Sequence, residues 1–327
     1  MPSSPPPRQP SSLPTAPARP AEGHRAFAPR RGKLCSAIGV ALATVGCAPP
    51  GPVAPAQAVE GLRQPVALGA PLNIALSVLR AGPADAPLLV LVHGTPGSAA
   101  SWADYLLQPP AGVQVVALDR PGFGQSGPDG ALPGLAEQAA AVVALLPSDG
   151  RPVVLLGHSL GGPVVARVAA DHPGRITGLV LLAASLDPGQ EQIHPLQRVG
   201  DWAPLRGLLP RAIRNANTEL LALKPELEAL AEQLPRIRAR VVIVHGSADD
   251  LVPVANVAFM QARLTGASCV ITTLLDGRNH FLPWNSAAEV RQAVAQAFGP
   301  ALAGGGALTA ALPAALTAAP TAAPAPC

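Results

Sequence analysis

The stretch VVLLGHSLGG, residues 153–162, decides the fold of this chain. It runs from four apolar residues into Ser159, which has a glycine two positions away on either side. The apolar run predicts a buried strand, and a helix is expected to begin near Leu160. So sharp a strand-to-helix turn strains the serine backbone, exposes its Oγ and tolerates only small neighbours. We therefore interpret Ser159 as a nucleophile. A glycine-rich turn with a capping serine is the structural alternative.

Apolar runs of strand length recur along the chain and alternate with segments of helical length. The runs are residues 88–92, 113–118, 153–156, 178–182, 241–244 and 269–275. The segments that separate most of them include residues 98–107, 135–146, 160–170 and 286–298. This alternation predicts an α/β fold with a mostly parallel central sheet that is covered by helices on both faces. Residues 65–79 alternate more and contain a turn, which favours an antiparallel hairpin at one edge.

A serine hydroxyl is a poor nucleophile at neutral pH, so it needs a base and an acid that orients the base. Of the seven histidines, His280 follows the last apolar run across the short loop DGRN and can reach over the end of the sheet. We expect His280 to be the general base, with a buried structural histidine as the alternative. Asp249 and Asp250 both follow residues 241–244 and qualify by position as the acid. Asp276 is closer to His280 along the chain but is typical of a turn.

Five segments in order resemble the motifs of the α/β-hydrolase family. They are HGTPG (93–97), DRPGFGQSG (119–127), GHSLGG (157–162), GSADDLVP (246–253) and GRNHFLPW (277–284). The resemblance covers nearly all of residues 65–298. It implies that Asp249 is the catalytic acid and that the backbone N–H groups of Thr95 and Leu160 form an oxyanion hole. It also implies that Asp119 and Arg120 stabilise the loop under the site.

The nucleophile indicates the reaction, because members of this family with a serine at the turn carry out acyl transfer. The chain is therefore expected to be a serine hydrolase that cleaves a small to medium carboxylic ester, or a related acyl compound, through an acyl-enzyme on Ser159. The expected partner is a small-molecule acyl substrate. Three alternatives stay open: an acyltransferase, a prolyl-type aminopeptidase with the same triad, and a non-catalytic binding protein anchored in the cell envelope.

An insert of about residues 186–238 interrupts the alternation and is mainly helical in pattern. The family places a cap over the active site here. Trp202 and Trp284 are candidates to line an acyl pocket, with core packing as the alternative. The basic residues Arg206, Arg211 and Arg214 are expected to be a solvated helix face; an anionic substrate or a lipid headgroup is the second interpretation.

The two ends of the chain differ in composition from its body. Residues 1–59 are expected to be a disordered leader, residues 60–300 the catalytic domain and residues 301–327 a disordered low-complexity tail. The segment APRRGKLCSAIGVALATVGC (28–47) resembles a bacterial lipoprotein signal. The prediction is cleavage before Cys47, lipidation of Cys47 and membrane anchoring in the cell envelope. A mis-assigned start or a spacer on a cytoplasmic enzyme is the alternative.

Charge and cysteine usage exclude several other classes. Six basic residues and one acidic residue lie in residues 1–59, whereas the remainder is nearly neutral, so nothing indicates a nucleic-acid partner. The spacing of the four cysteines suggests neither a disulfide framework nor a zinc site, and Cys269 is interpreted as a small core residue. The sequence contains no phosphate-binding or HExxH motif, so no cofactor and no metal are expected. It carries no signal for an oligomeric state.

Overall fold

The computed structural model describes Met1 and residues 54–302. Within residues 54–302, eight strands form one sheet in the order β1-β2-β4-β3-β5-β6-β7-β8. The strands are β1 (Arg63–Leu68), β2 (Ile74–Ala81), β3 (Leu88–Val92), β4 (Gln114–Leu118), β5 (Val153–His158), β6 (Gly178–Leu182), β7 (Arg240–Gly246) and β8 (Cys269–Leu275). Strand β2 is antiparallel to β1 and β4, and the other neighbours are parallel. The predicted mostly parallel sheet with an edge hairpin is confirmed.

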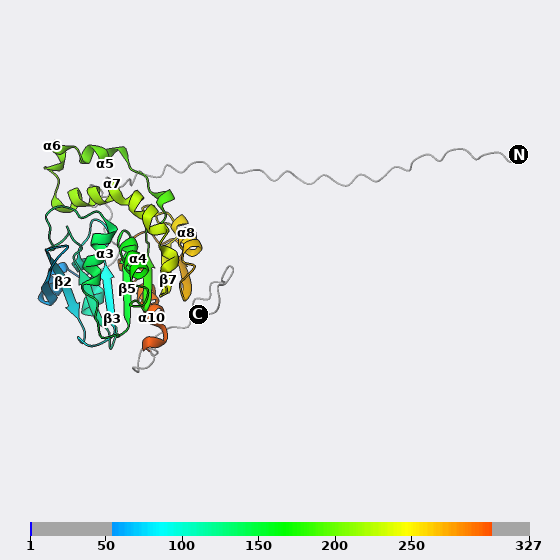
Figure 1. The fold of residues 1–327 in the computed structure, drawn as a ribbon, viewed down its shortest axis with the longest axis horizontal. Helices are drawn as coiled ribbons and strands as arrows, with labels where there is room; N and C mark the ends of the chain where they lie inside the picture. The colour runs from blue at the N-terminus through cyan, green and yellow to red at the C-terminus, as the bar shows by residue number, and fades with distance from the viewer. Residues whose placement is uncertain (2–53, 303–327) are drawn as a thin grey trace. The chain divides into compact units, whose positions relative to one another are not determined.

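Helices cover both faces of the sheet, as the apolar runs predict (Figure 1). One face packs against α3 (Leu135–Val143), α4 (Gly161–Asp171) and α8 (Ala255–Arg263). The other packs against η1 (Ala56–Leu62), η2 (Ala99–Trp102), α2 (Ala103–Leu107) and α10 (Ala287–Phe298). Two short elements, α9 (Leu282–Asn285) and η5 (Gly299–Leu302), flank α10.

The central strands are apolar throughout because each side of the sheet is buried. All five residues of β3 are buried: Leu88, Val90 and Val92 belong to one core, and Leu89 and Leu91 to the other. Successive side chains of a strand point to opposite faces, so a strand between two helical layers needs an apolar residue at every position.

The insert between β6 and β7 forms a helical cap. It consists of η3 (Pro188–Gln190), α5 (Pro195–Gly200), α6 (Ala203–Arg206), α7 (Arg211–Ala231) and η4 (Leu234–Arg236). Helices α5, α6 and α7 lie together beyond one end of the sheet (Figure 1). Within the part of the chain that is described, none of the helices combines the length and the apolar character needed to cross a bilayer.

Cys269 differs in one respect from the expectation. It is buried at the start of β8, as a core residue would be, but its sulfur is disulfide-bonded. The spacing of the cysteines gave no indication of this bond, because chain folding, and not sequence distance, decides which sulfurs can meet.

Candidate active site

Ser159 occupies the sharp turn between β5 and α4. Its φ is +55°, a left-handed conformation that L-residues other than Asn and Asp seldom adopt. A Cβ on Gly157 would lie 2.2 Å from the Gly161 carbonyl oxygen, and a Cβ on Gly161 would lie 2.4 Å from the Val92 carbonyl oxygen. The turn therefore requires both glycines around Ser159.

The loop after β3 lies against the same serine. A Cβ on Gly94 would lie 2.8 Å from the Ser159 Cβ and 3.3 Å from its Oγ, so the Gly94 backbone packs directly on Ser159. Among the described residues, the backbone N–H groups of Thr95 and Leu160 donate to no other residue. Two free N–H groups on either side of a serine suit the binding of a negatively charged oxygen.

Asp249 and His280 meet at this end of the sheet. Asp249 follows β7 and His280 follows β8, and His280 Nδ1 donates to Asp249 Oδ2 at 2.8 Å. The second carboxylate oxygen, Oδ1, accepts the N–H groups of Leu251 (2.9 Å) and Val252 (2.8 Å). Asp249 is buried, whereas Asp250 is exposed. Of the two aspartates that the sequence left open, the structure therefore pairs Asp249 with His280.

His158, the residue before Ser159, contacts His280. Its Nε2 donates to the His280 carbonyl oxygen at 3.0 Å, and the two imidazole centroids are 4.7 Å apart. Among the described residues the Ser159 hydroxyl has no hydrogen-bond partner. The structure thus places His280 against His158, the residue next to the nucleophile.

Burial and hydrogen bonding set the charge of the site. Burial would raise the pKa of Asp249, but the hydrogen bond and positive potential of His280, with the N–H of Val252, outweigh it and lower that pKa. Burial lowers the pKa of His158 to about 3 and that of His93 well below its ordinary value. Burial also lowers the pKa of His245, whose Nε2 lies 3.5 Å from Asp249 Oδ2. Neutral histidines and an ionised aspartate therefore surround the candidate base.

These lowered pKa values predict a loss of stability in mild acid. His93, His158 and His245 resist protonation in the folded state, whereas in the unfolded chain a histidine takes up a proton below about pH 6.5. The unfolded state then binds more protons than the folded state. The free energy of unfolding is therefore highest above about pH 6.5 and declines as the pH falls below that value. Between pH 7.5 and 5 the free energy of unfolding should fall by on the order of 2 kcal/mol from His158 alone, because its folded-state pKa of about 3 lies below this range. His93 and His245 should add to the fall in the same direction.

Chemical denaturation at stepped pH measures this effect. His158→Gln keeps a donor for the His280 carbonyl oxygen but does not titrate, so its pH dependence should be shallower than that of the wild type. An unfolding free energy that is constant from pH 7.5 to 5 would show that these histidines are not buried as neutral groups.

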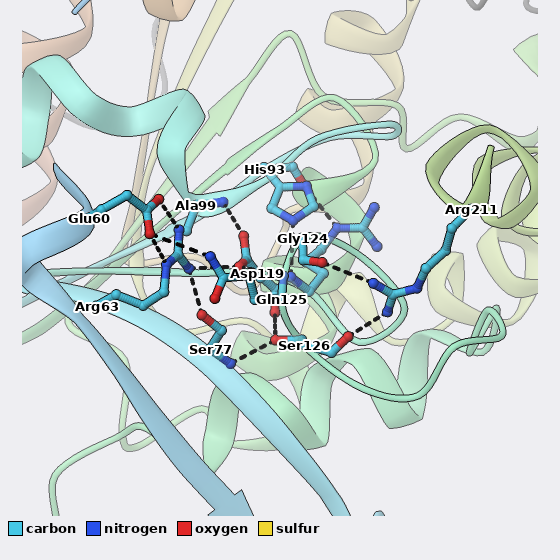
Figure 2. A network of polar contacts seen from close by, with 11 residues as sticks. Glu60, Arg63, Ser77, His93, Ala99, Asp119, Gly124, Gln125, Ser126 and Arg211 are labelled. Carbon is cyan, nitrogen blue, oxygen red and sulfur yellow. Dashed lines mark hydrogen bonds and ion pairs between the residues drawn. The ribbon is translucent and has the colours of Figure 1, made fainter. Parts of the chain in front are cut away.

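The loop that follows β4 is stabilised by a network of polar contacts centred on Asp119 (Figure 2). Asp119 Oδ1 accepts the N–H of Ala99 at 2.7 Å, and Oδ2 accepts the Gln125 N–H and the Arg63 guanidinium, both at 2.9 Å. Ser126 Oγ donates to the Asp119 carbonyl oxygen at 2.6 Å. These contacts are structural, and they tie β1, η2 and the 119–126 loop together.

Trp202 is not where the pocket interpretation requires it. It is 62% exposed and stands immediately before α6 in the cap. It belongs to a row of exposed apolar residues at every third position. We name this row the cap ridge: Ile193, Leu196, Val199, Trp202, Leu205 and Leu208.

Trp284, by contrast, packs beside the candidate triad. It is partly buried, its Nε1 donates to the Ser101 carbonyl oxygen at 3.1 Å, and its ring meets His158 edge-on at 5.8 Å between centroids. The two tryptophans thus have different environments: Trp284 packs against the residue next to Ser159, whereas Trp202 is exposed.

The basic residues of the cap are largely engaged with protein groups. Arg211 donates to the carbonyl oxygens of Gly124 (2.9 Å), Ser126 and Pro128 (2.7 Å). Arg214 pairs with Asp129 at 2.7 Å, and Arg206 lies 3.7 Å from Asp201. The expectation of a solvated face is therefore wrong for Arg211 and Arg214, because these side chains fasten α7 to the loop after β4.

Two further residues at the site have weak sequence signals or none. His158 stands next to the serine in GHSLGG, but side chains of adjacent residues on a tight turn commonly point apart, so the motif does not predict its contact with His280. Glu219 lies in the middle of the charged, helical segment of the cap and has no motif around it. Its contact with Arg120, 2.6 Å between Nη1 and Oε1, joins residues 99 positions apart. Within residues 54–302, no three His, Cys, Asp or Glu side chains are grouped so as to hold a metal ion.

The sequence of this chain is similar to those of known proteins. A family model described as alpha/beta hydrolase fold matches residues 87–206. A non-heme chloroperoxidase from Streptomyces lividans is 30% identical over 228 residues, which are 56% of this chain and 82% of that protein.

Other relatives match over a shorter part. The pimeloyl-[acyl-carrier protein] methyl ester esterase of Aeromonas salmonicida is 40% identical over 116 residues, 34% of this chain and 42% of that protein. This chain thus spans less than half of the esterase that it matches. Among solved structures, the 2-hydroxy-6-oxo-6-phenylhexa-2,4-dienoate hydrolase of Rhodococcus sp. strain RHA1 has a TM-score of 0.57 at 19% identity, covering 72% of this chain and 98% of that one.

Proposed function

We propose, from the premise that this chain belongs to the α/β-hydrolase family, that it is a serine hydrolase that cleaves small to medium carboxylic esters. One observation carries the proposal. The Asp249–His280 hydrogen bond of 2.8 Å lies against His158, the neighbour of a serine whose φ is +55° at the start of a helix. A scaffold protein with the same sheet has no need for a strained serine, a histidine and a buried aspartate at one edge.

The residues act in a fixed order during the first half of the reaction. The Ser159 hydroxyl oxygen attacks the ester carbonyl carbon while His280 Nε2 takes the hydroxyl proton. The negative charge on the carbonyl oxygen is stabilised by the N–H groups of Thr95 and Leu160. The C–O bond to the alcohol then breaks, and the alcohol leaves with the proton from His280. The product is an acyl group on Ser159.

Hydrolysis of this acyl-enzyme uses the same groups again. A water molecule attacks the acyl carbon and gives its proton to His280, which returns it to Ser159 as the carboxylic acid leaves. Asp249 holds the imidazole with Nδ1 protonated, so that Nε2 is free to accept a proton in both steps. No group outside the chain is needed except water.

A panel of p-nitrophenyl esters of graded acyl length tests the proposal. We expect turnover of the short and medium esters, with release of acid and alcohol in equal amounts. Added alcohols separate an acyltransferase from a hydrolase, because a transferase would form a new ester in preference to free acid. Prolyl amides test the aminopeptidase alternative. Pure, folded protein that turns over none of the esters would contradict the proposal.

The proposal places the enzyme at the cell envelope, held by a lipid on Cys47. Support comes from the sequence: three basic residues, an apolar run and the ending TVGC precede this position, which is outside the described residues. Only six residues separate Cys47 from Ala54, the first residue of the described domain, so the anchor would keep the domain close to a bilayer. The cap ridge gives further support, since exposed apolar rows that include a tryptophan are typical of surfaces that meet lipid.

Mass spectrometry of the mature amino terminus tests the location. We expect a lipid-modified peptide beginning at Cys47 in the membrane fraction. Cys47→Ser should remove the modification and release the protein from membranes. An intact Met1 terminus in the cytoplasmic fraction would contradict this part of the proposal and leave the ester chemistry unaffected.

A further inference from the structure

A buried cation links the cap to the loop that carries one oxyanion donor. Arg120 is fully buried. Its Nε donates to the His93 carbonyl oxygen at 2.9 Å, and its Nη2 donates to the Gly94 carbonyl oxygen at 3.0 Å. On the other side, Nη1 and Nη2 donate to the two carboxylate oxygens of Glu219 at 2.6 and 3.0 Å. The Arg120 guanidinium and the Glu219 carboxylate are therefore joined by two hydrogen bonds, which fix the orientation of both groups as well as the distance between them.

The Gly94 carbonyl oxygen is part of the same peptide group as the Thr95 N–H. A trans peptide is planar, and its N–H points opposite to its C=O. A donor on the Gly94 oxygen therefore orients the Thr95 N–H. Two donors hold that oxygen: Arg120 Nη2, and His93 Nδ1 at 2.7 Å. The Arg120 backbone N–H donates to His93 Nε2 at 3.0 Å, which leaves the His93 proton on Nδ1.

This oriented peptide packs on the nucleophile, since Gly94 has no room for a Cβ beside Ser159. Rotation of the peptide plane would turn the Thr95 N–H away from the point where the oxyanion forms. Catalytic hydrogen bonds to an oxyanion are sensitive to such rotation, because the donor must face the developing charge.

From these contacts we infer that Glu219, a residue of the cap, is a positioning residue for the oxyanion hole, because it holds the Arg120 fork that orients the Gly94–Thr95 peptide. The inference rests on the proposed ester hydrolysis. Glu219 does not touch the substrate in this scheme. It acts through Arg120, and its carboxylate is 2% exposed and balances the buried charge.

The face of α7 that carries Glu219 contacts the loop after β4 through three side chains. Arg211, Asn215 and Glu219 are spaced by four residues and therefore lie on one side of the helix. Arg211 binds the Gly124 carbonyl oxygen, as Figure 2 shows, and Asn215 Nδ2 donates to the Gly122 carbonyl oxygen at 2.8 Å. Helix α7 and the loop after β4 thus form one unit, so a change in the cap reaches the oxyanion donor through Arg120.

Glu219→Gln tests the inference, and Glu226→Gln is its matched control. Glu226 is on the same helix seven residues later and its carboxylate accepts the Leu135 N–H at 2.8 Å, but it does not contact Arg120. We expect Glu219→Gln to lower kcat about 10- to 100-fold with KM changed less than about threefold, since the donor is misplaced and not removed. The affinity for a boronic acid that forms a tetrahedral adduct should fall by the same factor as kcat/KM. Glu226→Gln should leave all three values near those of the wild type.

A double variant guards against a simple folding defect. Glu219→Leu with Arg120→Met removes both charges, so no unpaired ion stays buried, and such replacements are often well tolerated. It should unfold at a temperature near that of the wild type and still lose kcat and boronic acid affinity. Wild-type kcat in Glu219→Gln, or equal losses in Glu219→Gln and Glu226→Gln, would overturn the inference. A wild-type enzyme without esterase activity would instead overturn the proposed function on which it rests.

Discussion

Ser159→Ala is expected to reduce ester turnover by about 10⁶-fold. The residual rate is the catalysis that substrate binding and the oxyanion hole supply without a nucleophile. The reason is that no other hydroxyl is available at the turn to form the acyl-enzyme, so His280 and Asp249 have no nucleophile to activate. Steady-state kinetics with a p-nitrophenyl ester measure the loss. Thermal unfolding should change little, because alanine has the same backbone restriction and nearly the same size as serine.

A companion variant at the same position separates chemistry from backbone strain. Ser159→Gly should be as inactive as Ser159→Ala but more stable than it, by about 1 kcal/mol, because glycine accepts a φ of +55° without the cost that a Cβ imposes. The comparison uses the midpoints of chemical denaturation. Activity that survives in either variant would show that another residue is the nucleophile, and unfolding of both would assign Ser159 a structural role.

Asp249→Asn is the second large effect, with an expected loss in kcat of about 10⁴-fold. Asp249 Oδ1 accepts two backbone N–H groups, from Leu251 and Val252, so the oxygen of an asparagine must stay on that side. Its NH₂ group then faces His280 Nδ1 and donates to it. The imidazole proton is forced onto Nε2, the atom that must accept the Ser159 proton.

Asp250→Asn is the matched control for this prediction. Asp250 is the next residue, carries the same charge and is exposed, and among the described residues no hydrogen bond joins it to His280. Its activity should stay within about twofold of the wild type, since an exposed charge away from the reacting atoms contributes little. The reverse pattern, with Asp250→Asn inactive and Asp249→Asn active, would reassign the acid.

The sheet could be predicted from the sequence because its strands are unusually uniform. Runs such as Leu88–Val92 and Gly178–Leu182 are apolar at every position, which only a strand buried on both faces requires. The nucleophile turn could be predicted for a similar reason. Gly157 and Gly161 are separated from Ser159 by one residue each, and the close contacts of the turn explain both glycines.

Contacts between distant segments could not be predicted in the same way. Glu219 and Arg120 meet only because α7 packs over the loop after β4, and a charged residue on an amphipathic helix gives no sign of its partner. Trp202 shows the opposite error. An aromatic residue in a cap suggested a pocket, but Trp202 is largely exposed beside α6. Hydrophobic periodicity predicts which residues share a face of a helix, but it does not predict which part of the protein that face contacts.

Covalent labelling tests the central claim, that Ser159, Asp249 and His280 work as one unit. A fluorophosphonate reacts with an activated serine, and peptide mass spectrometry locates the adduct and measures its rate of formation. The account predicts a single adduct on the peptide that contains Ser159, formed at least about 100-fold more slowly in His280→Ala and in Asp249→Asn. An adduct on another serine, or an unchanged rate in both variants, would contradict it.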